Sequence, residues 1–295
     1  MTVAASKSES PGSLSRRYAG SPQSILRDRF TRLSSLLILV ALLVQWGCAK
    51  KRVEWSSRSA DDLLHDIRKP VSSSSAISGS ARITSQTPDS LRKGRTYFAL
   101  KAPNQLLLEA VTPSDETVAV LVTNADKFMG FEVGDARCKT GAPCAENVGM
   151  LFPIALDSIQ IIRLLHGSPP LIAGSISGPS PLQDPPRLQV QIKHEKGAVQ
   201  TIDFSPDGKD VFESKITGEQ GLSLRIAYSN HQNLNADIRI PRDITVEDLA
   251  RESRVRIEVS EVGPFSPTPA TFNTQCPVGK LIMPMDCSPN TALPR

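Results

Sequence analysis

Residues 101–123, with the sequence KAPNQLLLEAVTPSDETVAVLVT, decide the fold. Two apolar runs, Gln105–Val111 and Glu116–Thr123, have the length and composition of β-strands, and the turn sequence Pro113-Ser-Asp115 separates them. Because this connection is so short, the two predicted strands are antiparallel neighbours. Apolar side chains occupy consecutive positions in both runs, so both faces of these strands must be covered by other parts of the protein.

The strand pattern continues on both sides of this hairpin. Short turn sequences again separate the runs, which favours an antiparallel meander. In the second half Leu188, Val190 and Ile192 alternate with polar residues, so those strands are expected to have one wet face. The predicted strands are Ala76–Ser85, Thr96–Lys101, Gln105–Val111, Glu116–Thr123, Lys127–Val133, Arg187–Lys193, Val199–Phe204, Val211–Lys215, Leu222–Ser229, Ala236–Ile240 and Val255–Val262.

Amphipathic segments predict helices that cover the sheet. Ser59-Ala-Asp-Asp62 is a variant of the capping box, and apolar residues then recur at helical spacing as far as Pro70. The segment at about Ala155–His166 is apolar over more of its surface than a helix on an outer face needs. A third short helix is expected at Val246–Glu252. The stretches 134–149, 173–186 and 263–295 are rich in Gly, Cys or Pro and are expected to be irregular.

One arrangement accounts for these patterns: a curved sheet with an apolar concave side, into which a helix inserts as a lid. Apolar residues of the central hairpin would form the wall of a lipid-binding cavity, and the helix would close it. An ordinary packed core explains the same residues and stays open as an alternative. The candidate cavity residues are Leu106, Leu108, Val118, Val120 and Val122 from the strands, and Ile159, Ile162 and Leu165 from the helix.

The N-terminal region has the features of an export signal. Three arginines at positions 27–32 precede Leu36–Val44, a run of nine apolar residues. A bilayer span needs roughly 20 apolar residues, so this run predicts a secretory signal. It ends at Gly47-Cys48, which resembles the lipobox of bacterial lipoproteins, although Gln45 and Trp46 depart from that pattern. Cys48 is therefore the predicted lipidation site. An uncleaved anchor, or an ordinary signal with a chance cysteine, is the alternative.

The distribution of charge fits removal of this segment. Residues 1–47 hold six of the 34 basic and two of the 30 acidic residues, so the chain from Cys48 onward has 28 of each. A neutral mature protein offers no basic surface to drive counterion release, and nucleic acid is not expected as a partner. Ala49 is not the Asp that retains enteric lipoproteins in the inner membrane. By that resemblance we expect the outer membrane, on its periplasmic side.

The remaining four cysteines are expected to form disulfides, as the oxidising periplasm allows. Local pairing, Cys138–Cys144 and Cys276–Cys287, closes the shortest loops and is the predicted connectivity. The alternative is a metal site. Neither pair has the two-residue spacing of zinc ligands, and no histidine lies near either pair. The sequence therefore predicts two disulfides and no metal.

Five segments carry a family resemblance. They are Ile77-Ser-Gly-Ser-Ala-Arg-Ile83, Lys101-Ala-Pro-Asn-Gln-Leu-Leu-Leu108, the strand–turn–strand at Val118–Val133, Leu164-Leu-His-Gly167 and Ile240-Pro-Arg-Asp-Ile-Thr-Val-Glu-Asp248. Together they resemble the Lol lipoprotein carrier and receptor superfamily, which includes the LolA/LolB-like proteins. The resemblance covers roughly residues 59–262.

The resemblance implies a mainly β fold with a few helices: a curved, unclosed antiparallel β half-barrel with helices plugging its concave side. It implies four parts: a signal peptide with an N-terminal extension (1–47), a tether (48–58), the half-barrel domain (59–262) and a Pro-rich tail with one cysteine pair (263–295). The implied function is that of a membrane-anchored lipoprotein that binds lipid or acylated cargo, for lipoprotein localisation or insertion. The alternative is a structural or assembly lipoprotein of the outer membrane, with a filled core and a protein partner that the sequence does not identify.

Catalytic patterns do not stand out in the sequence. HExxH, GxSxG and phosphate-binding glycine loops do not occur, and the four histidines are scattered. Ser90-Leu-Arg-Lys93 fits the bare SxxK pattern, but it falls in a turn and lacks the companion motifs. We therefore expect no enzymatic activity, no cofactor and no catalytic residues.

Overall fold

The computed structural model describes residues 53–72, 76–149, 156–218, 221–235 and 238–287. Residues from Val53 onward form one compact unit. The predicted signal segment and Cys48 lie outside the described residues, and the predicted boundaries between tether, domain and tail stay predictions. Within the described ranges, no helix has the length and hydropathy to cross a bilayer.

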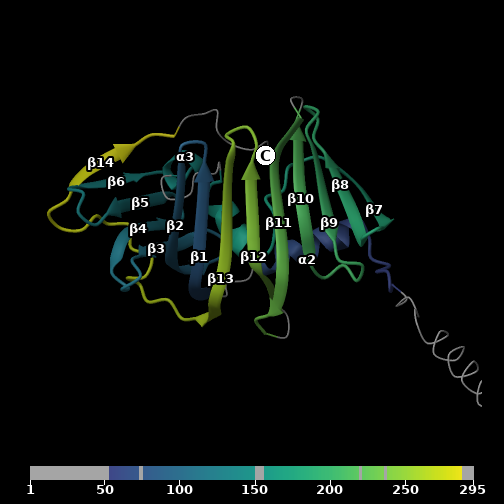
Figure 1. Ribbon diagram of the computed structural model, residues 1–295, viewed down its shortest axis with the longest axis horizontal. Coiled ribbons are helices and arrows are strands. Elements are labelled where there is room, and N and C mark those ends of the chain that lie inside the picture. The colour runs from purple at the N-terminus through teal and green to yellow at the C-terminus, as the bar shows by residue number, and fades with distance from the viewer. Residues whose placement is uncertain (1–52, 73–75, 150–155, 219–220, 236–237, 288–295) are drawn as a thin grey trace, which may run out of the picture. The chain divides into compact units, whose positions relative to one another are not determined.

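The described strands form a single large sheet that is not closed, because β14 and β7 are its two free edges (Figure 1). The strand order is β14-β6-β5-β4-β3-β2-β1-β13-β12-β11-β10-β9-β8-β7. The predicted curved antiparallel half-barrel is confirmed. The strands are β1 Ala76–Thr87, β2 Ser90–Lys101, β3 Gln105–Val111, β4 Thr117–Asn124, β5 Lys127–Glu132, β6 Arg137–Gly141, β7 Ser175–Gln183, β8 Pro186–Lys193, β9 Val199–Phe204, β10 Val211–Gly218, β11 Gly221–Asn233, β12 Arg239–Asp248, β13 Ser253–Phe265 and β14 Leu281–Met285.

Two meanders make up this sheet. Strands β1 to β6 pair in chain order, as do β7 to β13. The meanders meet where β1 pairs with β13 along its whole length, from Ala76 opposite Phe265 to Gln86 opposite Arg254. The tail then returns to the far edge, where β14 pairs with β6 and runs parallel to it.

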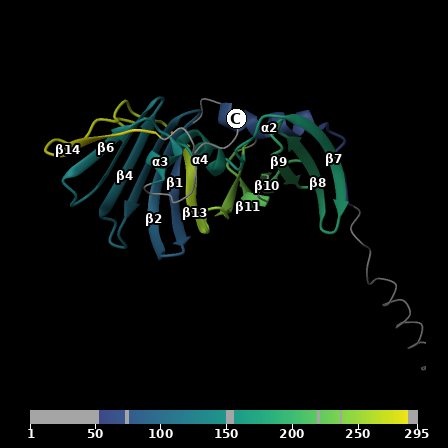
Figure 2. The same ribbon diagram turned by 90° about the horizontal axis from the view of Figure 1, so that it is seen from above.

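The helices α2 (Ala60–Ser72) and α4 (Ser158–Leu165) pack on one face of the sheet, which we call the inner face (Figure 2). α2 contacts β7, whereas α4 contacts β3 and β12. The predicted cap of α2 is present: the Asp62 amide donates to the Ser59 hydroxyl at 3.1 Å, and the Ser59 amide donates to the Asp62 carboxylate at 3.2 Å. α4 begins with a full capping box between Asp157 and Gln160.

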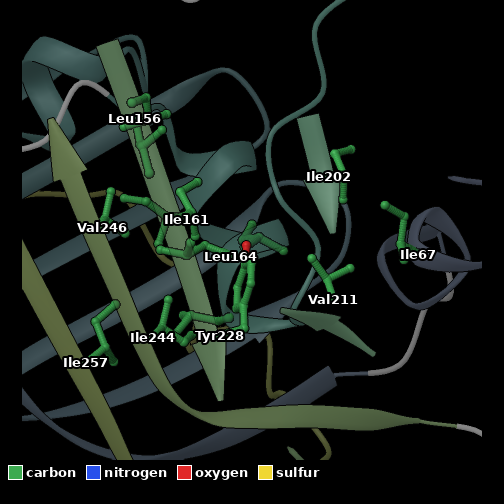
Figure 3. Close-up of a cluster of buried hydrophobic side chains, with 14 of the residues drawn as sticks. Ile67, Leu156, Ile161, Leu164, Ile202, Val211, Tyr228, Ile244, Val246 and Ile257 are labelled. Atoms are coloured by element: carbon green, nitrogen blue, oxygen red, sulfur yellow. The ribbon is translucent and has the colours of Figure 1, made fainter. Parts of the chain in front are cut away.

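The main core lies between the inner face and these helices. Leu63 and Leu64 of α2 and Ile161, Ile162 and Leu164 of α4 are almost completely buried in it. Figure 3 shows α4 side chains beside inner-face residues of the second meander. The outward positions of that meander are polar: Arg225 pairs with Glu213 at 2.5 Å and with Glu247 at 3.3 Å. The predicted wet face of these strands is confirmed.

The opposite, outer face of β2–β5 is covered by the C-terminal tail. A second, smaller cluster there contains Ala99, Val122, Met129 and Cys138, and Phe272 of the tail is buried against them with 4% of its surface exposed. This explains why the strands of the central hairpin are apolar on both faces. α4 covers one face and the tail covers the other.

Several elements differ from the prediction. The expected helix at Val246–Glu252 is wrong: β12 runs to Asp248, and residues 249–252 form a turn. Three regions that were expected to be irregular contain regular elements, namely β6 with the short helix α3 (Ala145–Val148), β7, and β14. β6 lies next to the edge, and β7 and β14 are edge strands. Edge strands tolerate proline and glycine, the residues from which these segments were predicted to be irregular.

Candidate functional site

A pocket of about 540 Å³ lies on the inner face at one end of β1–β4. This volume is within the range of small-molecule binding pockets. Six of its fifteen lining residues are apolar, and four small hydroxyl side chains and two glycines add little side-chain bulk. The apolar residues are Ile83, Leu108, Ala110, Val111, Val118 and Ala119; the other lining residues are Ser85, Thr87, Ser90, Arg92, Lys93, Gly94, Thr96, Glu132 and Gly149.

The size of the side chains in successive cross-strand rows explains where the pocket lies. One row across β2, β3 and β4 consists of large residues and belongs to the core, whereas the next inner-face row consists of small residues and lines the pocket. These rows are Phe98, Leu108 and Leu121, and then Thr96, Ala110 and Ala119. We call the second set the small-residue row. The sheet continues past it with too little side-chain volume to fill the space.

The structure separates the predicted cavity residues into four places. Leu106, Ile162 and Leu165 are buried in the main core, with at most 6% of their surface exposed. Leu108 and Val118 line the 540 Å³ pocket.

Val120 and Val122 lie on the outer face, with the cluster that the tail covers. Ile159 is on α4 with 38% of its surface exposed. The prediction that all eight residues line one cavity is therefore wrong.

A β-bulge causes this error. Near the turn Val111 pairs with Thr117, whereas Ala110 pairs with Ala119, so β4 has one extra residue at Val118. Without the bulge, Leu108 would lie opposite Val120, and the two would share a face as the prediction assumed; with it, Leu108 lies opposite Leu121. One inserted residue moves every later side chain to the other face of the sheet.

Sequence reasoning missed the small-residue row. Its signal was present, because Thr96, Ala110 and Ala119 are small residues at the turn-side ends of three adjacent predicted strands. Recognising it required the correct pairing of β3 with β4.

A second pocket of about 250 Å³ lies beside β5 and β6. Val120 and Phe131, which are paired outer-face residues, contribute to its lining together with Arg137. The C-terminal tail contacts β5 beside this pocket. The Lys280 ammonium lies 5.0 Å from the centre of the Phe131 ring and donates to the Glu132 carbonyl at 3.2 Å. This pocket is smaller and more polar than the inner one.

The four cysteines predicted to form disulfides do so, but the predicted local pairing is wrong. The bonds are Cys138–Cys276 and Cys144–Cys287. Parallel pairing of β14 with β6 is the reason. In a parallel pair the N-terminal ends of the two strands lie side by side, and so do their C-terminal ends. Cys276, before β14, therefore lies beside Cys138 near the start of β6. Cys287, after β14, lies beside Cys144, which follows β6. The local pairing was predicted because short loops lose the least entropy on closure. That reasoning did not include the pairing of β14 with β6.

Three polar side chains, those of Gln200, His166 and Tyr228, are buried in or beside the main core. Gln200 donates to the Pro170 carbonyl at 2.7 Å and accepts from the Ile172 amide at 3.0 Å, which fastens the segment after α4 to β9. His166 contacts the Ile162 carbonyl at 2.9 Å through Nδ1, and burial lowers its pKa. Burial raises the pKa of Tyr228 well above its ordinary value. Among the described residues, no three His, Cys, Asp or Glu side chains are grouped as metal ligands would be.

Fold and site together define a class: an unclosed, curved antiparallel sheet with helices on its inner face and a pocket beside them. Solved structures similar to this chain include a LolA superfamily protein from Nitrosomonas europaea (TM-score 0.48, 11% identity, covering 74% of this chain and 98% of that one). They also include a DUF1329 family protein from Desulfovibrio piger (TM-score 0.52, 12% identity, covering 72% and 95%).

These structural neighbours include a protein of the superfamily that the sequence resembles. At 12% identity the likeness to the Desulfovibrio protein concerns the fold alone. No protein-family model and no curated protein matches the chain.

Proposed function

We propose that this protein is a lipid-anchored, periplasm-facing lipoprotein whose inner-face pocket takes an acyl chain of a lipid or of an acylated cargo. The observation that carries the proposal is the pocket over the small-residue row. An acyl chain in it would cover the accessible apolar residues Ile83, Ala110 and Val118, and each methylene removed from water contributes about 0.8 kcal/mol. Lipoprotein localisation or insertion is the role we propose for such binding.

The structure limits where a chain can lie. The middle of the inner face is filled by α4, since Ile162 is fully buried and Leu165 is 6% exposed. The proposed acyl site is therefore at the turn-side ends of β1–β4, beyond the packed core. The filled middle also favours the second candidate, a structural or assembly lipoprotein that uses the same fold to present a surface to a protein partner.

Filling the pocket distinguishes these two functions. We expect Ala110→Leu to reduce uptake of a fluorescent fatty acyl probe at least about tenfold, because three added carbon atoms occupy the space over the small-residue row. Stability should change little, since Ala110 is only half-buried and faces the open pocket. Probe fluorescence titrated against the purified mature protein measures the uptake, and thermal melting measures stability.

Ala227→Leu is the matched control, because it adds the same atoms to a half-buried position on β11 away from the pocket. It should leave uptake unchanged. If the wild-type protein takes up no probe, the acyl-binding proposal fails and the structural role stands.

Membrane attachment is tested separately. We expect Cys48→Ser to move the protein from the membrane pellet to the soluble fraction, because two acyl chains on that cysteine would provide the stable anchor. Cell fractionation followed by immunoblotting measures the distribution. A variant that stays entirely in the pellet would contradict lipidation at Cys48, and separation of inner from outer membranes tests the proposed location.

A further inference from the structure

We propose that the inner-face pocket selects amphiphiles with an anionic head group, held at its mouth by Arg92. This inference rests on the proposed acyl-binding function and specifies the chemistry of the polar end. The class of ligand is a single acyl chain that carries a phosphate or a similar acidic group.

A cation without an ion-pair partner stands at the pocket mouth. Arg92 of β2 lines the pocket, is exposed, and pairs with Ser85 of the inner face. Within the described part of the chain Arg92 makes no ion pair, whereas the nearby Arg95 is held by Asp115 and Tyr97. A guanidinium beside an apolar pocket, with no carboxylate bound to it, is suited to receive an acidic head group.

Hydroxyl groups add hydrogen-bonding capacity at the same place. Thr87 and Ser90 line the pocket at the β1–β2 turn, and their hydroxyl oxygens lie 2.9 Å apart. A phosphate oxygen accepts hydrogen bonds from hydroxyls, ammonium and guanidinium groups, and the bonds from charged donors are the stronger ones. The turn end of β1 and β2 thus brings a guanidinium group and two hydroxyl groups to one rim of the pocket.

The acidic group in the lining lies on the opposite rim. Glu132 is at the end of β5, opposite Ala119, whereas Arg92 is on β2, opposite Ser85. Strands β3 and β4 separate them, which corresponds to about 14 Å for three strand spacings. An anion at Arg92 is thus much farther from the Glu132 carboxylate than from the guanidinium. The charges give the pocket a direction, with the polar end of the ligand at the β1–β2 turn.

Binding of two lysolipids with the same acyl chain tests this inference. Lysophosphatidylglycerol carries a net negative head group, and lysophosphatidylcholine carries a zwitterionic one. We expect the full-length mature protein to bind the first about tenfold more tightly in low salt, as one or two exposed charge-assisted contacts provide. Isothermal titration calorimetry measures both affinities. The variant Arg92→Gln should bind the two lysolipids equally while keeping the wild-type affinity for the choline lipid.

The matched control is Arg82→Gln. It removes the same charge from an exposed position on the outer side of β1. It should keep the preference. Equal wild-type binding of both lysolipids, or a preference that persists in the Arg92 variant, overturns the inference and leaves the acyl site intact. If neither lysolipid binds, the proposed acyl-binding function itself fails.

Discussion

Replacing Cys138 and Cys276 together by alanine is expected to lower the free energy of unfolding by roughly 3 kcal/mol through loop entropy alone. The remaining Cys144–Cys287 bond still closes a loop of 143 positions. With that bond in place the second bond closes a ring of only about 17 positions, because 138 and 144 lie six apart and 276 and 287 lie eleven apart. Removing both bonds should cost roughly 8 kcal/mol in the same entropy model, and therefore more than twice the loss for one.

The pair Cys144→Ala/Cys287→Ala provides the matched control. It opens a ring of the same size, but Cys287 is exposed, whereas Cys138 is fully buried in the outer-face cluster with Phe272. The Cys138/Cys276 variant should therefore lose more stability than the control. Denaturant unfolding under non-reducing conditions measures both values. Peptide mapping that finds Cys138 bonded to Cys144 would contradict the connectivity from which these numbers follow.

Replacing Leu106 by aspartate is expected to unfold the domain. Leu106 is fully buried in the main core, and a carboxylate without a partner in an apolar environment costs several kcal/mol. That cost is comparable to the whole stability of a typical domain. Circular dichroism and thermal melting should show loss of the cooperative transition.

Ala110→Asp is the comparison on the same strand and the same face, four residues away. Ala110 lines the open pocket, where water can solvate the carboxylate, so we expect a folded protein with at most about 1 kcal/mol lost. Uptake of the acyl probe should nevertheless be abolished, because a charge then occupies the proposed acyl site. If Ala110→Asp unfolds as completely as Leu106→Asp, the pocket is part of the packed core and carries no ligand.

The sequence was sufficient for the central strands and for the class of fold. Gln105–Val111 has the predicted bounds, and the capping residues Ser59 and Asp62 start α2 as expected. These predictions succeed because strand composition, turn residues and helix caps act over a few neighbouring residues. The apolar residues on both faces of the hairpin also correctly indicated that another part of the protein covers each face.

Features that depend on distant parts of the chain could not be predicted in the same way. The bulge at Val118 reverses which side chains share a face, and no turn or propensity signal marks it. β14 forms only because β6 offers an edge more than a hundred residues earlier in the chain, and the disulfide pairing follows from that contact. The candidate site was therefore assigned to the right strands and in large part to the wrong side chains.

The pairing of β1 with β13 has a consequence for how the protein reaches this structure. Each meander can assemble from strands that are neighbours in sequence, but the central seam joins Ala76 to Phe265, close to the two ends of the described domain. Contacts between such distant residues are slow to form, because the intervening chain must first lose entropy. The seam cannot close until nearly the whole polypeptide has emerged from the ribosome or the membrane. Until then β1 is an edge strand of the first meander, with one side unpaired. An exposed strand edge promotes aggregation, so the first meander needs protection until β13 pairs with it.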